Sequence, residues 1–129
     1  MLVKDITDYL AAENVGTVGV DLFYNDMPPE PDTGVMIEDL TGGVPDYVHD
    51  DNAPLVHHLR FQAFSRGPSY DAAEAKAQAV YTALQKLRAG GSINGSSYEA
   101  VIPTSDPAKF STDMQRRVVF HQEFEVIKT

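Results

Sequence analysis

Histidine is the side chain of this sequence best suited to metal binding or acid–base chemistry, and four histidines are present. His57 and His58 are neighbours on an expected strand, so their side chains point to opposite faces and cannot bind one ion together. His49 precedes two aspartates in an expected loop, without a recognisable spacing of metal ligands. We therefore interpret the histidines as loop and strand-surface residues, and we expect no metal site.

The sequence also lacks the motifs that indicate nucleophilic catalysis or phosphate binding. Ser, His and Asp are all present, so composition alone leaves a catalytic triad open, but no Gly-x-Ser-x-Gly elbow precedes a helix. Neither Gly-x4-Gly-Lys-Ser/Thr nor Gly-x-Gly-x-x-Gly occurs, so no phosphate-binding loop is predicted. Cysteine is absent, which excludes a thiolate metal site and a redox role. We therefore expect neither an enzyme nor a bound cofactor.

Acidic residues are concentrated in one stretch of the chain. The net charge is −9, and the interval from Asn25 to Ala53 contains eight Asp or Glu residues and no Lys or Arg. A domain that grips DNA or RNA would show the opposite bias, because Lys and Arg bind phosphates. The stretch is either a set of solvated loops or a surface that repels DNA or meets a basic partner. The residues proposed for such a surface are Asp26, Glu30, Asp32, Asp46, Asp50 and Asp51.

The elements that would position these side chains are clearest in the middle of the chain. Residues 55–64 alternate between apolar and polar side chains, which predicts a half-buried strand. Ser69 and Asp71 then supply a helix N-cap and a first-turn carboxylate, and Gly90 follows the expected helix end. We predict a helix over 69–88 that packs one apolar stripe on a sheet. The stripe consists of Tyr70, Ala73, Ala77, Val80, Tyr81, Leu84 and Leu87.

A second face of this helix consists of small side chains. Four alanines, spaced three or four residues apart, are expected on the side away from the apolar stripe. They are Ala72, Ala75, Ala79 and Ala83. Small side chains let another backbone approach closely, so we interpret this face as a possible subunit interface. The alternative is that alanine simply favours helix at surface positions.

The remaining pattern predicts a single α+β domain over residues 1–129, with the element order α-β-β-β-α-β-β. A mostly antiparallel sheet would carry two helices on one face. The further expected elements are a helix at 2–13 and strands at 17–26, 34–40, 98–103 and 116–128, with loops at 27–32, 43–54, 90–97 and 104–113. In the first strand, Val18, Val20 and Leu22 are expected to face the core. No apolar run reaches the length of a signal peptide or a membrane span, so we expect a soluble protein.

Two blocks of the sequence carry a family resemblance. One is MPPEPDTGVMIEDLTGG (27–43), a proline-punctuated loop followed by a short strand and a Gly-Gly turn. The other is the central strand and helix, with His58, Arg60 and Gln62 on the polar face of the strand and Ser69-Tyr70 opening the helix. Together with the expected first helix and last strand, these blocks resemble the minor-capsid or tail-terminator (tail completion) proteins of long-tailed bacteriophages over nearly the whole chain.

The resemblance implies an α+β domain that assembles into a homo-oligomeric ring, a hexamer, at the head-proximal end of the tail tube. Such a ring stops tube growth and offers a surface to the head connector, so the implied partners are the tail tube protein and a connector or neck protein. It implies a virion protein, assembled in the host bacterial cytoplasm, with no catalytic residues. DNA would pass through the ring without specific binding, and no membrane is implied.

Two other functions stay open on the sequence alone. One is another head–tail connector or neck component of the same virion, and the other is a small-molecule-binding α+β domain. A ring-shaped oligomer would favour either virion role, whereas a strict monomer with a deep pocket would favour small-molecule binding.

Overall fold

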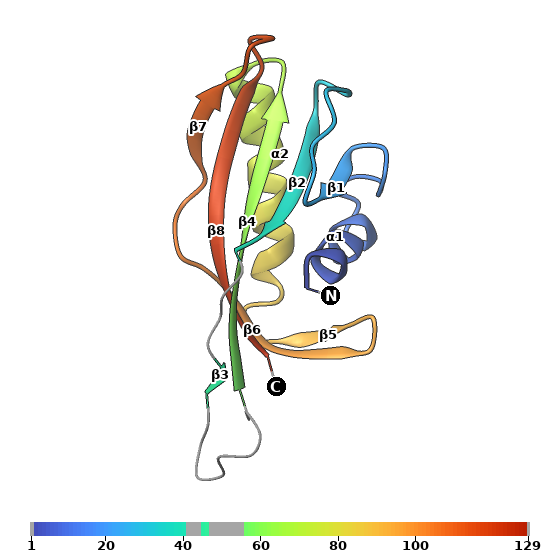
Figure 1. Ribbon diagram of the computed structural model, residues 1–129, viewed down its shortest axis with the longest axis vertical. Helices are drawn as coiled ribbons and strands as arrows, with labels where there is room; N and C mark the ends of the chain where they lie inside the picture. Colours follow the sequence, from blue (N-terminus) through green and yellow to red (C-terminus); the bar gives the residue numbers. More distant parts are fainter. Residues whose placement is uncertain (1, 41–44, 47–55, 129) are drawn as a thin grey trace.

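The computed structural model describes residues 2–40, 45–46 and 56–128 of the chain. These residues form two helices and an eight-stranded sheet, and both helices pack on the same face of the sheet (Figure 1). The elements are α1 (Leu2–Ala12), β1 (Leu22–Tyr24), β2 (Gly34–Asp39), β3 (Pro45–Asp46), β4 (Val56–Gly67), α2 (Tyr70–Gln85), β5 (Gly91–Ile93), β6 (Ser96–Pro103), β7 (Ala108–Thr112) and β8 (Val118–Lys128). The expected α+β class is confirmed, with three short strands, β3, β5 and β7, added to the expected order.

The sheet is built around the long antiparallel pair β4 and β8. The strand order is β1-β2-β4-β8-β6-β5, while β3 pairs with β4 and β7 pairs with β8. The β4–β8 register runs from His57 opposite Lys128 to Gly67 opposite Val118. Among the described strand pairs, only β1 and β2 are parallel. The expected, mostly antiparallel sheet is therefore observed.

The core lies between the sheet and the two helices. Alternation along β4 and β8 turns Phe61 and Phe124 toward the helices, where their rings stack with centroids 4.9 Å apart. Ile6 and Leu10 of α1 and Leu84 of α2 complete the same buried cluster. One buried polar contact joins α1 to β6, since the Tyr98 hydroxyl donates to the Asp5 carboxylate at 2.5 Å. Burial and this hydrogen bond raise the pKa of Tyr98.

Helix α2 begins where its capping residues predict. The Ser69 side chain accepts a hydrogen bond from the Ala72 backbone N–H at 3.2 Å, as an N-cap does. Most of the expected stripe is buried, but Tyr70 is 49 % exposed. Tyr70 belongs to the first turn of α2, and its ring makes an edge-on contact with Phe120 of β8. Its assignment to the buried stripe was therefore wrong.

Three expected loops contain short strands. The expected turn at 90–97 is a hairpin of β5 and β6, in which Asn94 and Gly95 have φ of +52° and +80°. Two successive residues with positive φ are typical of the Asn-Gly hairpin turn. The expected loop 104–113 contains β7, and the expected loop 43–54 contains β3. The rest of that acidic loop and the Gly-Gly turn before it lie outside the described residues.

Two expectations about side-chain placement are also wrong. Val18 and Val20 are 40 % and 61 % exposed, because the first strand contains only residues 22–24 and the preceding segment is a turn. Only Leu22 of that alternating set is buried. In the expected strand 116–128, alternation also predicts that Arg117 faces solvent, opposite to Phe120 and Phe124. Arg117 is instead 7 % exposed because it packs against the proline-rich loop.

Candidate assembly surfaces

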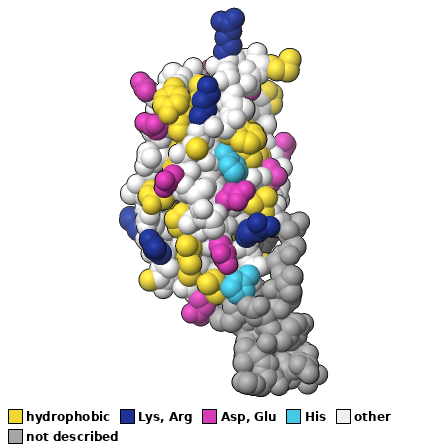
Figure 2. Space-filling model, turned by 90° about the vertical axis from the view of Figure 1, so that its left-hand side faces the viewer, with side chains coloured by type: hydrophobic (Ala, Val, Ile, Leu, Met, Phe, Trp, Pro, Cys, Tyr) yellow, Lys and Arg dark blue, Asp and Glu magenta, His cyan; other side chains and the backbone are white. Residues whose placement is uncertain are grey.

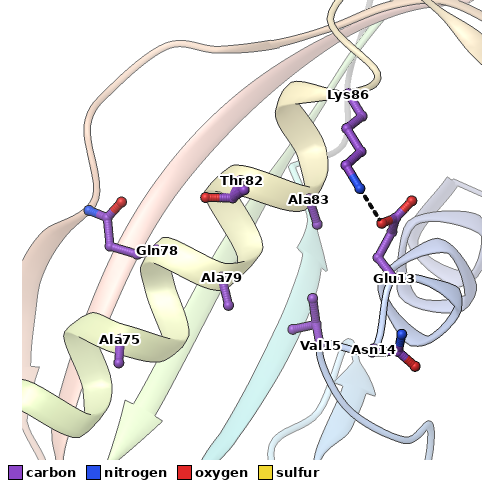
Figure 3. A pocket seen from close by; sticks show the side chains of 9 residues that line it. All are labelled: Glu13, Asn14, Val15, Ala75, Gln78, Ala79, Thr82, Ala83 and Lys86. Carbon is purple, nitrogen blue, oxygen red and sulfur yellow. Dashed lines mark hydrogen bonds and ion pairs between the residues drawn. The ribbon is translucent and has the colours of Figure 1, made fainter.

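A groove runs between the outer side of α2 and the segment that follows α1. It has a volume of about 360 Å³. Figure 3 shows Ala75, Gln78, Ala79 and Thr82 on one wall, contributed by α2, and Glu13, Asn14 and Val15 on the other. Ala83 of α2 and Lys86, the C-cap residue that follows α2, line the groove near its end. The groove contains the centre of the alanine face predicted from the sequence.

The four predicted interface alanines are not equivalent. Ala75 and Ala79 are exposed, Ala72 is half-buried, and Ala83 is only 5 % exposed. Ala83 belongs to the core because α1 packs over the last turns of α2, where the Tyr9 hydroxyl donates to the Ala83 carbonyl at 3.0 Å. Placing Ala83 on an outward face was therefore wrong, and the accessible part of this face centres on Ala75 and Ala79.

Charged contacts fix the second wall of the groove against α2. The Lys86 ammonium lies 2.7 Å from the Glu13 carboxylate, and the hydrogen bond between them lowers the pKa of Glu13 (Figure 3). The Lys76 ammonium donates to the Val15 carbonyl at 2.5 Å. The groove therefore has small side chains on one wall and an ion pair at its rim.

Two buried arginines hold the proline-rich loop between β1 and β2. The Arg66 guanidinium donates to the carbonyls of Pro28, at 2.9 Å, and of Pro31. Arg117 donates to the carbonyl of Pro29, and burial together with the nearby Arg117 lowers the pKa of Arg66. Proline has no N–H to donate to a neighbouring strand, but its carbonyl can still accept a hydrogen bond. The arginine side chains supply the donors that these proline carbonyls need.

These arginine contacts were not predicted from the sequence. They join residues 35 to 88 positions apart, and nothing in the local pattern around either arginine indicates them. Two carboxylates complete the arrangement, with Asp113 at 2.7 Å and Asp32 at 3.5 Å from Arg117 nitrogens. The loop therefore has internal anchors, which its composition alone did not suggest.

The predicted acidic surface is partly described. Asp26, Glu30 and Asp32 are exposed on the arginine-held loop. Asp46 lies in β3, opposite Val56, and its side chain is not described. Asp50 and Asp51 lie outside the described residues. The structure thus brings three of the six residues to one loop.

The polar residues of β4 and β8 lie on the sheet face without helices and contact one another. The His58 ring lies 3.0 Å from the Glu125 carboxylate, and the His121 ring lies 2.8 Å from the Gln62 amide oxygen. In the described part of the chain, no group of three or more His, Asp or Glu residues is placed to hold a metal ion. His49 lies outside that part. Figure 2 shows the side of the molecule at β7, where acidic, basic and apolar side chains are interspersed.

Fold and surfaces together define an α+β domain with a groove along α2 and an arginine-held, acidic loop between β1 and β2. Residues 9–129 match the bacteriophage tail terminator protein family, and the chain belongs to this family. It is therefore a structural protein of the phage virion, in the tail. Among the described helices, none has both the length and the apolar composition needed to cross a membrane.

Solved structures share the fold at low sequence identity. A chain from the virion of a native gene transfer agent particle is 16 % identical, with a TM-score of 0.65 over 98 % of this chain and 93 % of that one. A second solved chain is 11 % identical, with a TM-score of 0.50 over 97 % of this chain and 89 % of that one. A search of curated protein sequences finds no match.

Proposed function

We propose that the protein is the ring that ends the phage tail tube, formed by six copies at the head-proximal end. The ring stops polymerisation of the tube protein and gives the head connector a surface to join. The observation that carries this proposal is the family match over residues 9–129, which leaves only the first eight residues unmatched. The shared fold of the gene transfer agent virion chain, over 98 % of this chain, supports a role within a particle.

The shape of the subunit suits a protein with two different axial partners. The β1–β2 connection and the β7–β8 turn lie at one end of the elongated molecule, and the β5–β6 hairpin lies toward the other (Figure 1). Stacking of rings is open-ended unless one end fails to offer the surface that binds the next ring. A subunit whose ends carry different elements can bind the tube with one end and the connector with the other.

In this proposal, the α2 face and the acidic loop are both contact surfaces of the ring. The exposed alanines of α2, Ala75 and Ala79, contribute to contacts between subunits, where a neighbouring backbone can approach them closely. The loop that carries Asp26, Glu30 and Asp32 provides an acidic surface toward the DNA passage or toward a basic partner. We assign the same role to Asp46, Asp50 and Asp51 on the sequence alone, since Asp50 and Asp51 lie outside the described residues and the side chain of Asp46 is not described. These are structural roles, and the proposal assigns no catalysis, no cofactor and no specific nucleic-acid contact to the chain.

A reconstituted tube tests the proposal. Purified protein is added to tail tube protein of the same phage during polymerisation, and tube lengths are measured by electron microscopy. We expect tubes that carry a ring at one end and stop growing there, so that mean length falls as the protein is added. An unchanged length distribution, with no ring at either end, would refute the proposal. Light scattering of the protein alone should give about six times the 14.1 kDa subunit mass.

A further inference from the structure

Large apolar side chains are exposed at few places on the described surface, and most of them lie at opposite edges of the sheet. Val18 and Val20 precede β1, at 40 % and 61 % exposure, while Phe110 on β7 is 62 % exposed. Among the described strands, β1 pairs only with β2, and β7 pairs only with β8. Figure 1 places β1 and β7 on opposite sides of the molecule. Beside β1, the turn that carries Val18 bonds to Leu22 through Thr17 and Gly19, so this edge offers apolar side chains and not a free strand ladder. Each of these two edges of the sheet thus exposes large apolar side chains, a feature typical of surfaces that contact another chain.

Phe110 is held in place as an anchor before any partner binds. The register of β7 against β8 shifts between Lys109 and Ser111, so Phe110 is the extra residue of a bulge, a feature that re-aims side chains. Its ring rests against Phe64 and His121, each with centroids 5.4 Å away. An aromatic side chain fixed in this way loses little conformational freedom on binding, as is typical of interface anchors.

The opposite edge offers a groove that can receive such a side chain. It has a volume of about 340 Å³ and lies beside β1, where its walls include Val18, Leu22, Phe23 and Pro28. At about 30 Å³ per water, this volume corresponds to roughly eleven water molecules, which leaves room for an aromatic ring. The lining is mostly apolar, and its one charged residue is Asp26.

The charges beside the anchor and in the groove are complementary. Lys109 precedes Phe110 on β7, and both Lys109 and Asp26 are exposed. Neither residue has an ion-pair partner among the described residues. An unpaired cation at one edge and an unpaired anion at the other favour contact between two copies in one orientation.

We infer that β7 of one copy packs against the β1 edge of the next, with Phe110 in the groove and Lys109 facing Asp26. The inference rests on the proposed ring and adds a second subunit contact to the one proposed for Ala75 and Ala79. The contact is heterologous, since different patches of the two copies meet, and a heterologous contact repeated by rotation closes a ring. It also covers two of the edge strands of the described sheet, β1 and β7, and leaves the edge strands β3 and β5 outside the contact.

Disulfide trapping tests the contact directly, because the chain has no cysteine of its own. The full chain carrying both Lys109→Cys and Asp26→Cys is assembled and oxidised gently. We expect a ladder of covalent oligomers up to the ring size on a non-reducing gel, whereas each single-cysteine variant gives no ladder. Met114→Cys combined with Asp26→Cys is the matched control, since Met114 is fully exposed in the β7–β8 turn but lies outside the inferred contact.

Charge exchange gives a second, independent measurement by light scattering and sedimentation. Assembly should weaken at least tenfold, with unchanged circular dichroism, in each of the single variants Phe110→Ser, Lys109→Glu and Asp26→Lys. The double variant that combines Lys109→Glu with Asp26→Lys should restore assembly. Met114→Ser should assemble as wild type does. If wild-type rings form, yet these variants assemble equally well and the ladder is missing, the inferred contact is overturned and the proposed function stands. A wild-type chain that stays monomeric at every concentration overturns both.

Discussion

Replacing Leu84 by alanine should test whether α2 rests on the sheet as described. Leu84 is 1 % exposed and belongs to the main core cluster with Phe61 and Phe124. The substitution removes three buried carbon atoms, worth about 0.8 kcal/mol each, or about 2.4 kcal/mol in total. A residual cavity of about 50 Å³ would add about 1.2 kcal/mol at about 24 cal/mol per Å³. The free energy of unfolding should therefore fall by about 3.6 kcal/mol.

Urea unfolding followed by circular dichroism measures this loss, with wild type and variant compared at the same low concentration so that assembly does not contribute. Thr82→Ala is the matched control, because Thr82 is exposed on the same helix. A surface change of this kind should alter the free energy of unfolding by less than about 0.5 kcal/mol. A loss below about 0.5 kcal/mol for Leu84→Ala, equal to that of the control, would refute the packing of α2 on the sheet.

Two further predictions concern the helix groove and the buried tyrosine. Ala79→Glu should place a charge in the proposed subunit contact, giving monomers by light scattering with the fold intact by circular dichroism; wild-type assembly would show that this face is ordinary helix surface. Tyr98→Phe should lower the free energy of unfolding by about 1–3 kcal/mol, because the buried Asp5 loses the hydroxyl that donates to it. The pKa of Tyr98 is raised in the folded protein above its ordinary value of 10.0. As the pH rises above 10, the Tyr98 hydroxyl therefore loses its proton in the unfolded chain before it does so in the folded protein. Wild-type stability should therefore decline above about pH 10, and Tyr98→Phe should remove that part of the decline; an identical pH profile for both proteins would contradict this.

The central strand and helix were predictable because their signals are local. Alternation places Phe61 and Ala63 on the buried face of β4, and Ser69 caps α2 through a contact three residues away. The closing strand was predictable for the same reason, since Phe120, Phe124 and Val126 repeat every second or fourth residue and all are buried. A strand with one buried face shows this apolar alternation whichever element packs on that face, so the pattern can be recognised without knowing the tertiary contacts.

The remaining placements depend on contacts between distant parts of the chain. Ala83 follows the same spacing as Ala79, and only the packing of α1 makes one buried and the other exposed. Alternation at Val18 and Val20 is typical of a half-buried strand, yet their segment forms a turn beside the sheet edge. Almost all residues of β7 are exposed, and they form a strand only because they pair with β8. The Asn94-Gly95 hairpin was the exception, since this dipeptide is itself a hairpin signal that could have been read.

The measurement that tests the central claim most directly is electron microscopy of particles from a phage that carries a null allele of this gene. A protein that ends the tube is needed both to stop its growth and to join it to the head. We therefore expect filled heads without attached tails, together with tail tubes that have grown beyond their normal length. Free tails of normal, uniform length would contradict the account, because they would show that the tube ends without this protein.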